Sequence, residues 1–408
     1  MTPIDLDHNA TTPTRPEVWA AMRPAWDAGG NPASAHHAGR TARRFLEDAR
    51  ERVAALIGAA AEEVVFTSGA TEANNLALFG LAGEPGHMLA APIEHPCVIE
   101  PLKQLGTRGF AVEWLPVTNG GHVEQRAVVD RVRPDTRLVA LMLANHETGA
   151  LQPVRHVAKT LPNHVLLHSD AAQAVGKIPV NFRDMGVTSL TASGHKFGGP
   201  KGVGVLVLKR GTPLRPLLFG GHQQRGHRPG TEPVPLAVGF AAALELAVRE
   251  MDANRAKLEA LRARFLEKLK GQVRNPSPQP PPRSGEGESE RVSSPLRFGE
   301  GSGEGLSFTL NSPADALPTT LNLSFPGCRS DVLLMALDLA GVACSTGSAC
   351  SSGSLLPSPV LQAMGVPDEV LRSAIRFSFG PNLTEADIDD AADRVATCVR
   401  QVKGNRTD

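Results

Sequence analysis

Short runs of strand-favouring residues recur between residues 64 and 208, and helical or loop segments separate most of them. Strands that alternate with crossover helices pair in parallel, and several of these runs are apolar on both faces, as strands buried between two helix layers are. The alternation predicts an α/β fold with a mostly parallel sheet of seven strands. A short glycine-rich turn joins the last two runs, which allows an antiparallel pair there. The expected strands are 64–67, 88–93, 112–117, 138–144, 165–168, 189–192 and 203–208.

Outside this region the pattern indicates helices, further strands and one unusual segment. A helical stripe covers 41–58, and two strand-like runs, 321–325 and 374–379, flank a helix expected over 331–340. Between residues 275 and 305 the chain is rich in Pro, Gly, Ser and Glu. Such a composition cannot bury enough apolar surface to offset the entropy lost on ordering. We therefore predict a disordered insertion over 275–305 with no function of its own.

The composition is that of an ordinary globular protein, with 41% hydrophobic and 21% charged residues, and with 42 basic residues against 42 acidic ones. No block of like charge indicates a nucleic-acid or membrane surface. The N-terminus is acidic and lacks the apolar region of a signal peptide, and no apolar run approaches the roughly 18 residues of a membrane span. We expect a cytoplasmic protein that binds neither nucleic acid nor membranes.

The five cysteines predict neither a disulfide framework nor a metal centre. None forms a Cys-x-x-Cys pair, and the spacing of Cys344 and Cys350 fits no common zinc or iron–sulfur pattern. The one histidine pair, His36 and His37, consists of neighbours, and adjacent residues on a helix point apart. We expect no bound metal.

Two motifs carry the chemistry. Lys196 ends the motif 193–196, directly after a predicted strand, and an amine so placed can hold an aldehyde cofactor as a Schiff base. Cys350 lies in the Ser- and Gly-rich segment 347–353, which is typical of a mobile loop that carries a nucleophile. Alone, a lysine is usually a solvated charge and a cysteine usually a small buried hydrophobe. Together they favour a pyridoxal-phosphate enzyme that handles sulfur.

Three residues are placed to contact the ring of such a cofactor. Asp170 follows a predicted strand, at the end where α/β proteins bind ligands, and its carboxylate can keep a pyridine nitrogen protonated. Gln173 can reach the ring oxygen, and His95 can stack on the ring. The alternatives are a helix N-cap for Asp170 and an ordinary loop histidine for His95.

A phosphate site is predicted where the segment 66–75 passes from a strand into a helix through Gly69. The N–H groups at the helix start and the Thr71 hydroxyl would face a phosphate there, with Ser193 and His195 completing the site. An ordinary helix cap by Ser68 or Thr71 is the alternative.

As a set, these motifs resemble the cysteine desulfurases of the class-V aminotransferase family. The long Ser/Gly-rich cysteine loop is similar to that of their group I branch, which includes sulfur donors for iron–sulfur clusters. The resemblance implies a fold-type I pyridoxal-phosphate-dependent transferase with a large domain over 15–240 and a smaller α+β domain made of 1–14 and 241–408. The motifs are 6–13, 31–34, 67–75, 94–95, 147–149, 170–173, 193–202, 228–231, 321–325, 347–350 and 375–377.

The resemblance also implies a role for each matching residue. Lys196 would be the Schiff-base lysine and the base at the substrate α-carbon, Cys350 the persulfide-forming nucleophile, and Arg376 the bidentate partner of the substrate carboxylate. His95 would stack on the cofactor and act as an acid or base, and His146 stands where the family has an asparagine that contacts the phenolic oxygen. The other cofactor contacts would be Asp170 and Gln173 at the ring and Ala70, Thr71, Ser193 and His195 at the phosphate, with Thr231 from the partner subunit of a homodimer.

The implied activity converts L-cysteine to L-alanine, keeps the sulfur as a persulfide on Cys350 and passes it to an acceptor protein, for iron–sulfur cluster assembly or thiolation. Three alternatives stay open. They are a selenocysteine lyase, a class-V aminotransferase without sulfur chemistry, and a non-catalytic sulfur-transfer scaffold. The last two have no use for the lysine and cysteine together, whereas sequence separates sulfur from selenium poorly. The identity of the acceptor and the role of Cys344 are also open.

Overall fold

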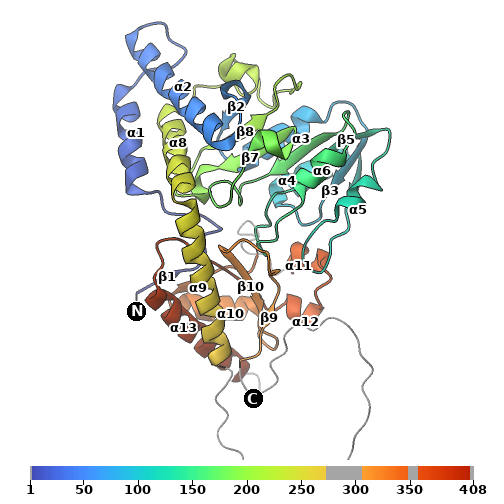
Figure 1. Cartoon of the computed structure of the whole chain (residues 1–408), viewed down its shortest axis with the longest axis vertical. Helices are drawn as coiled ribbons and strands as arrows, with labels where there is room; N and C mark the ends of the chain where they lie inside the picture. The colour runs from blue at the N-terminus through green and yellow to red at the C-terminus, as the bar shows by residue number, and fades with distance from the viewer. Residues whose placement is uncertain (1, 273–305, 348–356, 405–408) are drawn as a thin grey trace, which may run out of the picture.

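The computed structural model describes residues 2–272, 306–347 and 357–404 (Figure 1). Its largest sheet has seven strands in the order β2-β8-β7-β6-β5-β3-β4. Neighbours from β7 to β4 pair in parallel, whereas β8 is antiparallel to both β2 and β7. The predicted mostly parallel sheet is therefore confirmed. The strands are β2 (Val64–Thr67), β3 (His87–Ala90), β4 (Ala111–Trp114), β5 (Thr136–Ala140), β6 (Leu166–Asp170), β7 (Ser189–Ser193) and β8 (Gly204–Leu208).

Three predicted strands were too long. The observed strands end at Ala90, Trp114 and Ala140, three or four residues before the predicted ends at 93, 117 and 144. The residues beyond can remain fully apolar because the following loops pack against the core, with Ile93 0% and Met142 2% exposed. The apolar runs thus indicated burial correctly but not strand length.

Helices cover both faces of this sheet (Figure 1). In β5, Leu138 and Ala140 belong to the core cluster that includes α3 and α4, and Val139 belongs to the cluster on the other face, which includes α2 and α8. Successive side chains of a strand point to opposite faces, so a strand between two helix layers is apolar throughout. One layer holds α1 (Pro16–Ala28), α2 (His37–Ile57) and α8 (Val234–Arg249), and the other holds α3 (Ala70–Leu81) and α4 (Pro96–Gly106).

The helix α2 illustrates how local sequence defines one of these elements. Ala49 and Val53 lie on its buried stripe, as the periodicity predicted. The Nδ1 atom of His36 accepts a hydrogen bond from the backbone N–H of Gly39 at 3.3 Å, which caps the first turn. At the other end Gly58 adopts a left-handed φ of 71° and stops the helix. The side chain of His36 therefore acts as the N-cap of α2.

A second hydrophobic core lies beside α9 and contains a three-stranded antiparallel sheet in the order β12-β10-β9. The N-terminal strand β1 pairs in parallel with β11, so the chain begins in this second body and then crosses to the large sheet. Helix α9 follows α8 directly and links the two cores (Figure 1). The elements are β1 (Ile4–Asp5), α9 (Met251–Gly271), β9 (Thr309–Leu310), β10 (Thr320–Ser324), α10 (Ser330–Leu339), β11 (Val342–Ala343), α11 (Pro359–Ala363), α12 (Asp368–Leu371), β12 (Ala374–Ser378) and α13 (Glu385–Gly404).

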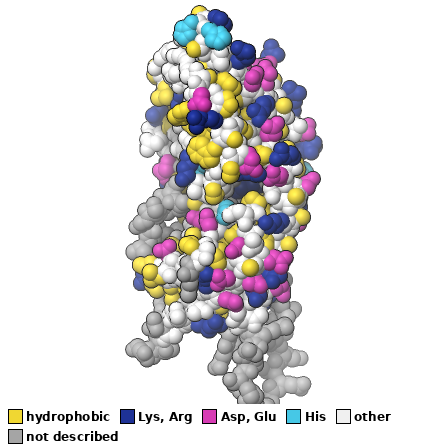
Figure 2. All heavy atoms as spheres, turned by 90° about the vertical axis from the view of Figure 1, so that its left-hand side faces the viewer, with side chains coloured by type: hydrophobic (Ala, Val, Ile, Leu, Met, Phe, Trp, Pro, Cys, Tyr) yellow, Lys and Arg dark blue, Asp and Glu magenta, His cyan; other side chains and the backbone are white. Residues whose placement is uncertain are grey.

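Shorter elements complete the described chain. They are the helices α5 (Gln125–Val129), α6 (Val154–Thr160) and α7 (Phe182–Met185) and the 3-10 turns η1 (Ala61–Glu63), η2 (Gly194–Lys196) and η3 (Gln223–Gly226). Acidic and basic side chains are interspersed over the face shown in Figure 2. No helix of the described chain is long and apolar enough to cross a membrane. The predicted insertion 275–305 and the predicted nucleophile Cys350 lie outside the described residues.

Candidate active site

The predicted site residues converge on one cavity of about 500 Å³. It opens at the carboxyl ends of β6 and β7, whose last residues are Asp170 and Ser193, and Arg376 reaches it from β12 of the second body. Thr231 is exposed and does not line it. The predicted residues that line the cavity are Ala70, Thr71, His95, His146, Asp170, Gln173, Ser193, His195, Lys196 and Arg376.

Lys196 is the last residue of the 3-10 turn η2, which follows β7. Its Nζ donates hydrogen bonds to the backbone oxygens of Asn9 at 2.7 Å and Ala10 at 3.0 Å. The backbone oxygen of His195 in turn accepts hydrogen bonds from the N–H and the hydroxyl of Thr12, both at 2.8 Å. The N-terminal segment therefore holds the lysine turn against the end of β7.

Asp170 belongs to a buried polar network that sequence reasoning missed. Its Oδ2 accepts from Asn74 Nδ2 at 2.7 Å, and its Oδ1 accepts from the N–H of Ala172 at 2.9 Å. The Oδ1 of Asn74 accepts from His168 Nε2 at 2.9 Å and from Thr191 Oγ1 at 2.6 Å. Burial lowers the pKa of His168 to about 4, so its imidazole is neutral near pH 7. A histidine directly after the apolar run 165–167, within a strand predicted to be buried, was the signal that could have revealed this network.

The alternative of Asp170 as a helix N-cap does not fit the fold. The backbone after β6 forms turns, and the next helix is α7. The Asp170 carboxylate therefore stabilises a turn with one oxygen and faces Asn74 with the other.

His95 caps the first turn of α4. Its Nδ1 accepts the backbone N–H of Cys97 at 3.1 Å and lies 2.9 Å from Cys97 Sγ. Burial is the largest effect on His95 and lowers its pKa; the Asp170 carboxylate opposes this effect, and the charge of Lys196 adds to it. Because Nδ1 acts as an acceptor, the hydrogen-bond pattern assigns the proton of the neutral ring to Nε2.

His146 presents an unsatisfied polar ring to the cavity. Neither ring nitrogen has a hydrogen-bond partner in the described chain, and the ring packs edge-to-face against His95 with centroids 5.1 Å apart. Burial holds the pKa of His146 well below its usual value, and the charges of His95 and Arg376 lower it further. The backbone oxygen of His146 accepts from Arg376 Nη1 at 3.1 Å, and the Nε of that arginine also lacks a partner there.

The start of α3 is open to the cavity. Its N-cap is Gly69, and no side chain caps the helix, so the alternative of a cap by Ser68 or Thr71 is wrong. Gly204 of β8 lies so close that a Cβ atom on it would be 2.6 Å from the carbonyl carbon of Gly69. Because no side chain caps α3, its first N–H groups are available for an anion.

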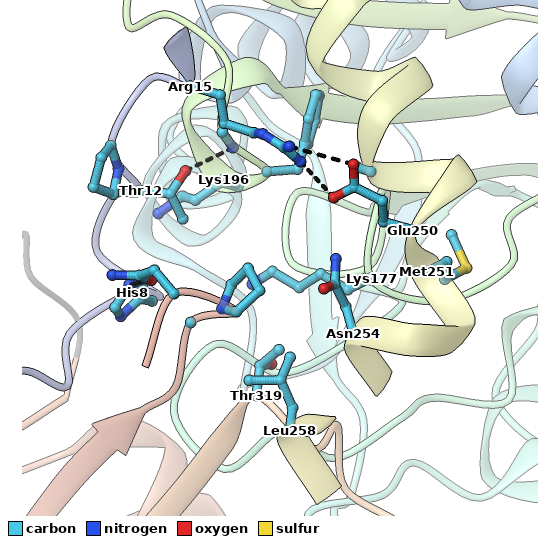
Figure 3. Close-up of a pocket in the computed structure, with 18 of the residues that line it drawn as sticks. His8, Thr12, Arg15, Lys177, Lys196, Glu250, Met251, Asn254, Leu258 and Thr319 are labelled. Atoms are coloured by element: carbon cyan, nitrogen blue, oxygen red, sulfur yellow. Dashed lines mark hydrogen bonds and ion pairs between the residues drawn. The ribbon is translucent and has the colours of Figure 1, made fainter. Parts of the chain in front are cut away.

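A second cavity of about 600 Å³ lies on the other side of Lys196, which lines both (Figure 3). Figure 3 shows the ion pair that borders it, in which Arg15 Nη1 lies 2.6 Å from Glu250 Oε2. Lys177 projects into it and donates to Gln173 Oε1 at 2.7 Å. Burial, together with the charge of Lys196, lowers the pKa of Lys177 to about 7. The hydrogen bond from Lys177, a residue of the second cavity, therefore orients the Gln173 side chain in the first cavity.

The geometry agrees with the comparison to known families. The family model described as "Aminotransferase class-V" matches residues 4–281 and 302–390. This chain belongs to that family. Members of the family use pyridoxal phosphate, and within it the chain groups with the cysteine desulfurases, as its motifs predicted.

Similar proteins cover nearly the whole chain. "Cysteine desulfurase IscS" of Dictyoglomus turgidum is 38% identical over 98% of this chain and 95% of its own length. The mitochondrial cysteine desulfurase of Drosophila melanogaster is 40% identical over 98% of this chain and 81% of its own length. Because the relatives include bacterial and mitochondrial proteins, the cytoplasmic location stays a prediction.

Two solved structures have the same fold. One described as "NifS-like protein" has a TM-score of 0.84 and 33% identity, and the match covers 98% of this chain and 100% of that one. The other, "SspA in complex with cysteine", has a TM-score of 0.76 and 32% identity, with 93% of this chain and 100% of that one covered. The fold-type I architecture predicted from the motifs is confirmed.

Proposed function

We propose that the first cavity binds pyridoxal 5'-phosphate and that the chain uses it to remove sulfur from L-cysteine. The ring nitrogens of His146 and the Nε of Arg376, all buried and without hydrogen-bond partners in the described chain, suit a polar ligand. When bound, pyridoxal phosphate supplies an aldehyde that joins amines and a ring that withdraws electrons from the neighbouring carbon.

The residues at the strand ends would hold the cofactor ring. Lys196 would join its aldehyde through Nζ, and Asp170 would pair with its ring nitrogen. His95 would stack on the ring, and Gln173 and His146 would donate to its phenolic oxygen. The lowered pKa of His146 supports this, since a neutral imidazole carries one N–H and adds no charge.

The phosphate would lie at the start of α3. The uncapped N–H groups there carry the partial positive charge of the helix dipole, which suits an anion. Thr71, Ser193 and His195 line the same cavity and would add their hydroxyl and imidazole groups, and Ala70 its backbone N–H.

We further propose a homodimer in which Thr231 of one subunit completes the phosphate site of the other. Arg228, three residues earlier, contacts Glu72 of α3 at 2.7 and 3.2 Å, and Glu72 lines the cavity. Thr231 is exposed and lies three residues beyond this contact with the cavity rim, so its side chain is accessible to a second subunit.

Arg376 and Lys196 would act on the substrate. The Nη2 of Arg376 contacts Asp7 Oδ1 at 2.7 Å, which together with its bond to the backbone of His146 fixes the guanidinium plane for a carboxylate. Lys196 would take the proton from the substrate α-carbon.

Cys350 would act as a thiolate and attack the sulfur of L-cysteine. The bond between that sulfur and the β-carbon breaks, the sulfur stays on Cys350 as a persulfide, and the three-carbon remainder takes up a proton and leaves as L-alanine. A thiol of an acceptor protein, such as an iron–sulfur scaffold or a thiolation carrier, would then receive the sulfur.

The observation that carries this proposal is that Lys196, Asp170 and the start of α3 open on one cavity. The test measures alanine and sulfide released from L-cysteine by the cofactor-loaded protein. Lys196→Ala should abolish turnover, whereas Lys209→Ala, which removes an exposed lysine after β8, should keep it. Full activity of Lys196→Ala would refute the proposal. Selenocysteine in the same assay, and a 2-oxo acid as amino acceptor, separate the lyase and aminotransferase alternatives.

A further inference from the structure

The Glu147 carboxylate lies where the two described ends of the cysteine segment meet. The Oγ of Ser358 donates to Glu147 Oε2 at 2.5 Å. A Cβ atom on Gly347 would lie 3.3 Å from both carboxylate oxygens. The described chain stops at Gly347 and resumes at Pro357, so one buried side chain, 2% exposed, contacts both ends of the segment that carries Cys350.

These two ends belong to different bodies of the protein. On the near side, Ser345 forms an antiparallel bridge with Arg376 of β12 in the second body. On the far side, α11 buries Val360 and Leu361 in the core of the large sheet. The carboxylate of Glu147 therefore lies at the junction between the two bodies.

Glu147 is itself held in place. The Oδ1 of Asn145 accepts the backbone N–H groups of Glu147 and Thr148, both at 2.9 Å, and Asn145 Nδ2 donates to the backbone oxygen of Ile93 at 3.0 Å. From the second body, Asn322 Nδ2 donates to the backbone oxygen of Glu147 at 3.4 Å. A residue whose backbone is anchored on both sides can use its carboxylate to hold other groups at a defined position.

The same loop faces the cofactor cavity. The Nε2 of His146 lies 3.6 Å from Glu147 Oε1, and His146 lines the cavity. Its backbone oxygen accepts from Arg376, the proposed partner of the substrate carboxylate. One short loop thus contacts the proposed cofactor site, the substrate-binding arginine and both described ends of the cysteine segment.

We propose that Glu147 is a positioning residue for the sulfur-transfer step, which holds Gly347 and Ser358 beside the cofactor cavity. This inference rests on the proposed function, since it concerns delivery of Cys350 to the substrate. Small misplacements of reacting groups slow a reaction by about tenfold to a hundredfold, so loss of the carboxylate slows persulfide formation by that range. Binding of L-cysteine does not need Glu147 and is retained.

The experiment follows a single turnover with two readouts on cofactor-loaded protein. The absorbance change on adding L-cysteine reports substrate binding, and peptide mass reports persulfide on Cys350. Glu147→Ala should keep the first and slow the second at least about tenfold. Glu147→Gln retains an oxygen that accepts from Ser358 and should recover most of the rate. Glu63→Gln controls for loss of a buried carboxylate away from the cavity.

Ser358→Ala removes the same hydrogen bond from the other partner and keeps the carboxylate, so it serves if Glu147→Ala fails to fold. It should slow persulfide formation, and the double variant with Glu147→Ala should be no slower than Glu147→Ala alone. Wild-type rates in Glu147→Ala or Ser358→Ala, or equal losses of the two readouts, would overturn the inference. A wild-type protein that forms no persulfide would instead refute the proposed function.

Discussion

The side-chain amide of Asn74 donates a hydrogen bond to Asp170 Oδ2 at 2.7 Å. The side-chain oxygen of Asn74 accepts two hydrogen bonds, from His168 and Thr191, and Asn74 is 0% exposed. Because both donors reach the amide oxygen, the amide NH₂ group has to face Asp170. The Asn74 amide thereby holds the Asp170 side chain in the orientation from which it would pair with a protonated ring nitrogen.

Asn74→Ala should therefore weaken catalysis while the cofactor stays bound. Loss of a hydrogen bond to a charged group costs about 1.5–3 kcal/mol, so kcat/KM should fall at least about tenfold. Alanine release gives the rate, and absorbance gives the cofactor content. Asn75→Ala is the matched control, since Asn75 Nδ2 donates to the backbone oxygen of Thr71 in the same helix. Equal kinetics in both variants would contradict the assigned role of Asn74.

Gly204→Ala should weaken cofactor binding through the start of α3. The added Cβ atom would lie 2.6 Å from the carbonyl carbon of Gly69 and 2.8 Å from the backbone oxygen of Ala192, so the helix start has to shift. Overpacking of this kind costs about 1–3 kcal/mol. Titration with pyridoxal phosphate and the thermal midpoint measure both effects. Gly271→Ala, where an added Cβ atom would have no neighbour within 4 Å among the described residues outside its own helix, should change neither.

The Lys177 side chain should make the free energy of unfolding rise with pH above about pH 7. Burial and the charge of Lys196 lower the pKa of Lys177 from 10.5 to about 7 in the folded protein. Between these pH values the unfolded chain binds the proton that the folded chain has lost, so the free energy of unfolding rises with pH. Below about pH 7 both states are protonated, and the cost of burying the charge is fully present.

Lys177→Met should flatten this rise. The test compares thermal midpoints of wild type and variant at intervals from pH 7 to pH 10.5, the range set by the two pKa values. Lys270→Met, on α9, controls for loss of a lysine from the exposed surface. A slope that is the same in wild type and Lys177→Met would show that Lys177 does not titrate in this range.

Cys344 should not carry the transferred sulfur. It follows β11, and burial, with a further contribution from the Asp7 carboxylate, raises the pKa of its thiol, which disfavours the reactive thiolate. Cys344→Ser should keep most of its turnover, whereas Cys350→Ser should bind L-cysteine, hold no persulfide and release little alanine. Peptide mass mapping of the bound sulfur decides between them. Sulfur found on Cys344 of the wild type and retained in Cys350→Ser would reverse the assignment.

The amino-acid sequence by itself was sufficient for the mostly parallel sheet and for placing Asp170 and Lys196 near the ends of two of its strands. Apolar runs separated by helical or loop segments located β6 and β7. Residues at the carboxyl ends of such strands face a common site, so the local pattern was enough to single out Asp170 and Lys196. Motif resemblance then supplied roles for both residues. Strand length was predicted poorly at β3 and β5, because the loops that follow are as buried as the strands.

Only the tertiary structure decided which polar groups meet. Asn74 and Asp170 are 96 positions apart, and Glu147 and Ser358 are 211 apart, so no local pattern relates either pair. The lowered pKa of His146 likewise depends on the segments that bury it. Backbone preferences and apolar periodicity act over a few residues, whereas hydrogen-bond partners and desolvation are set by segments that meet only when the chain packs.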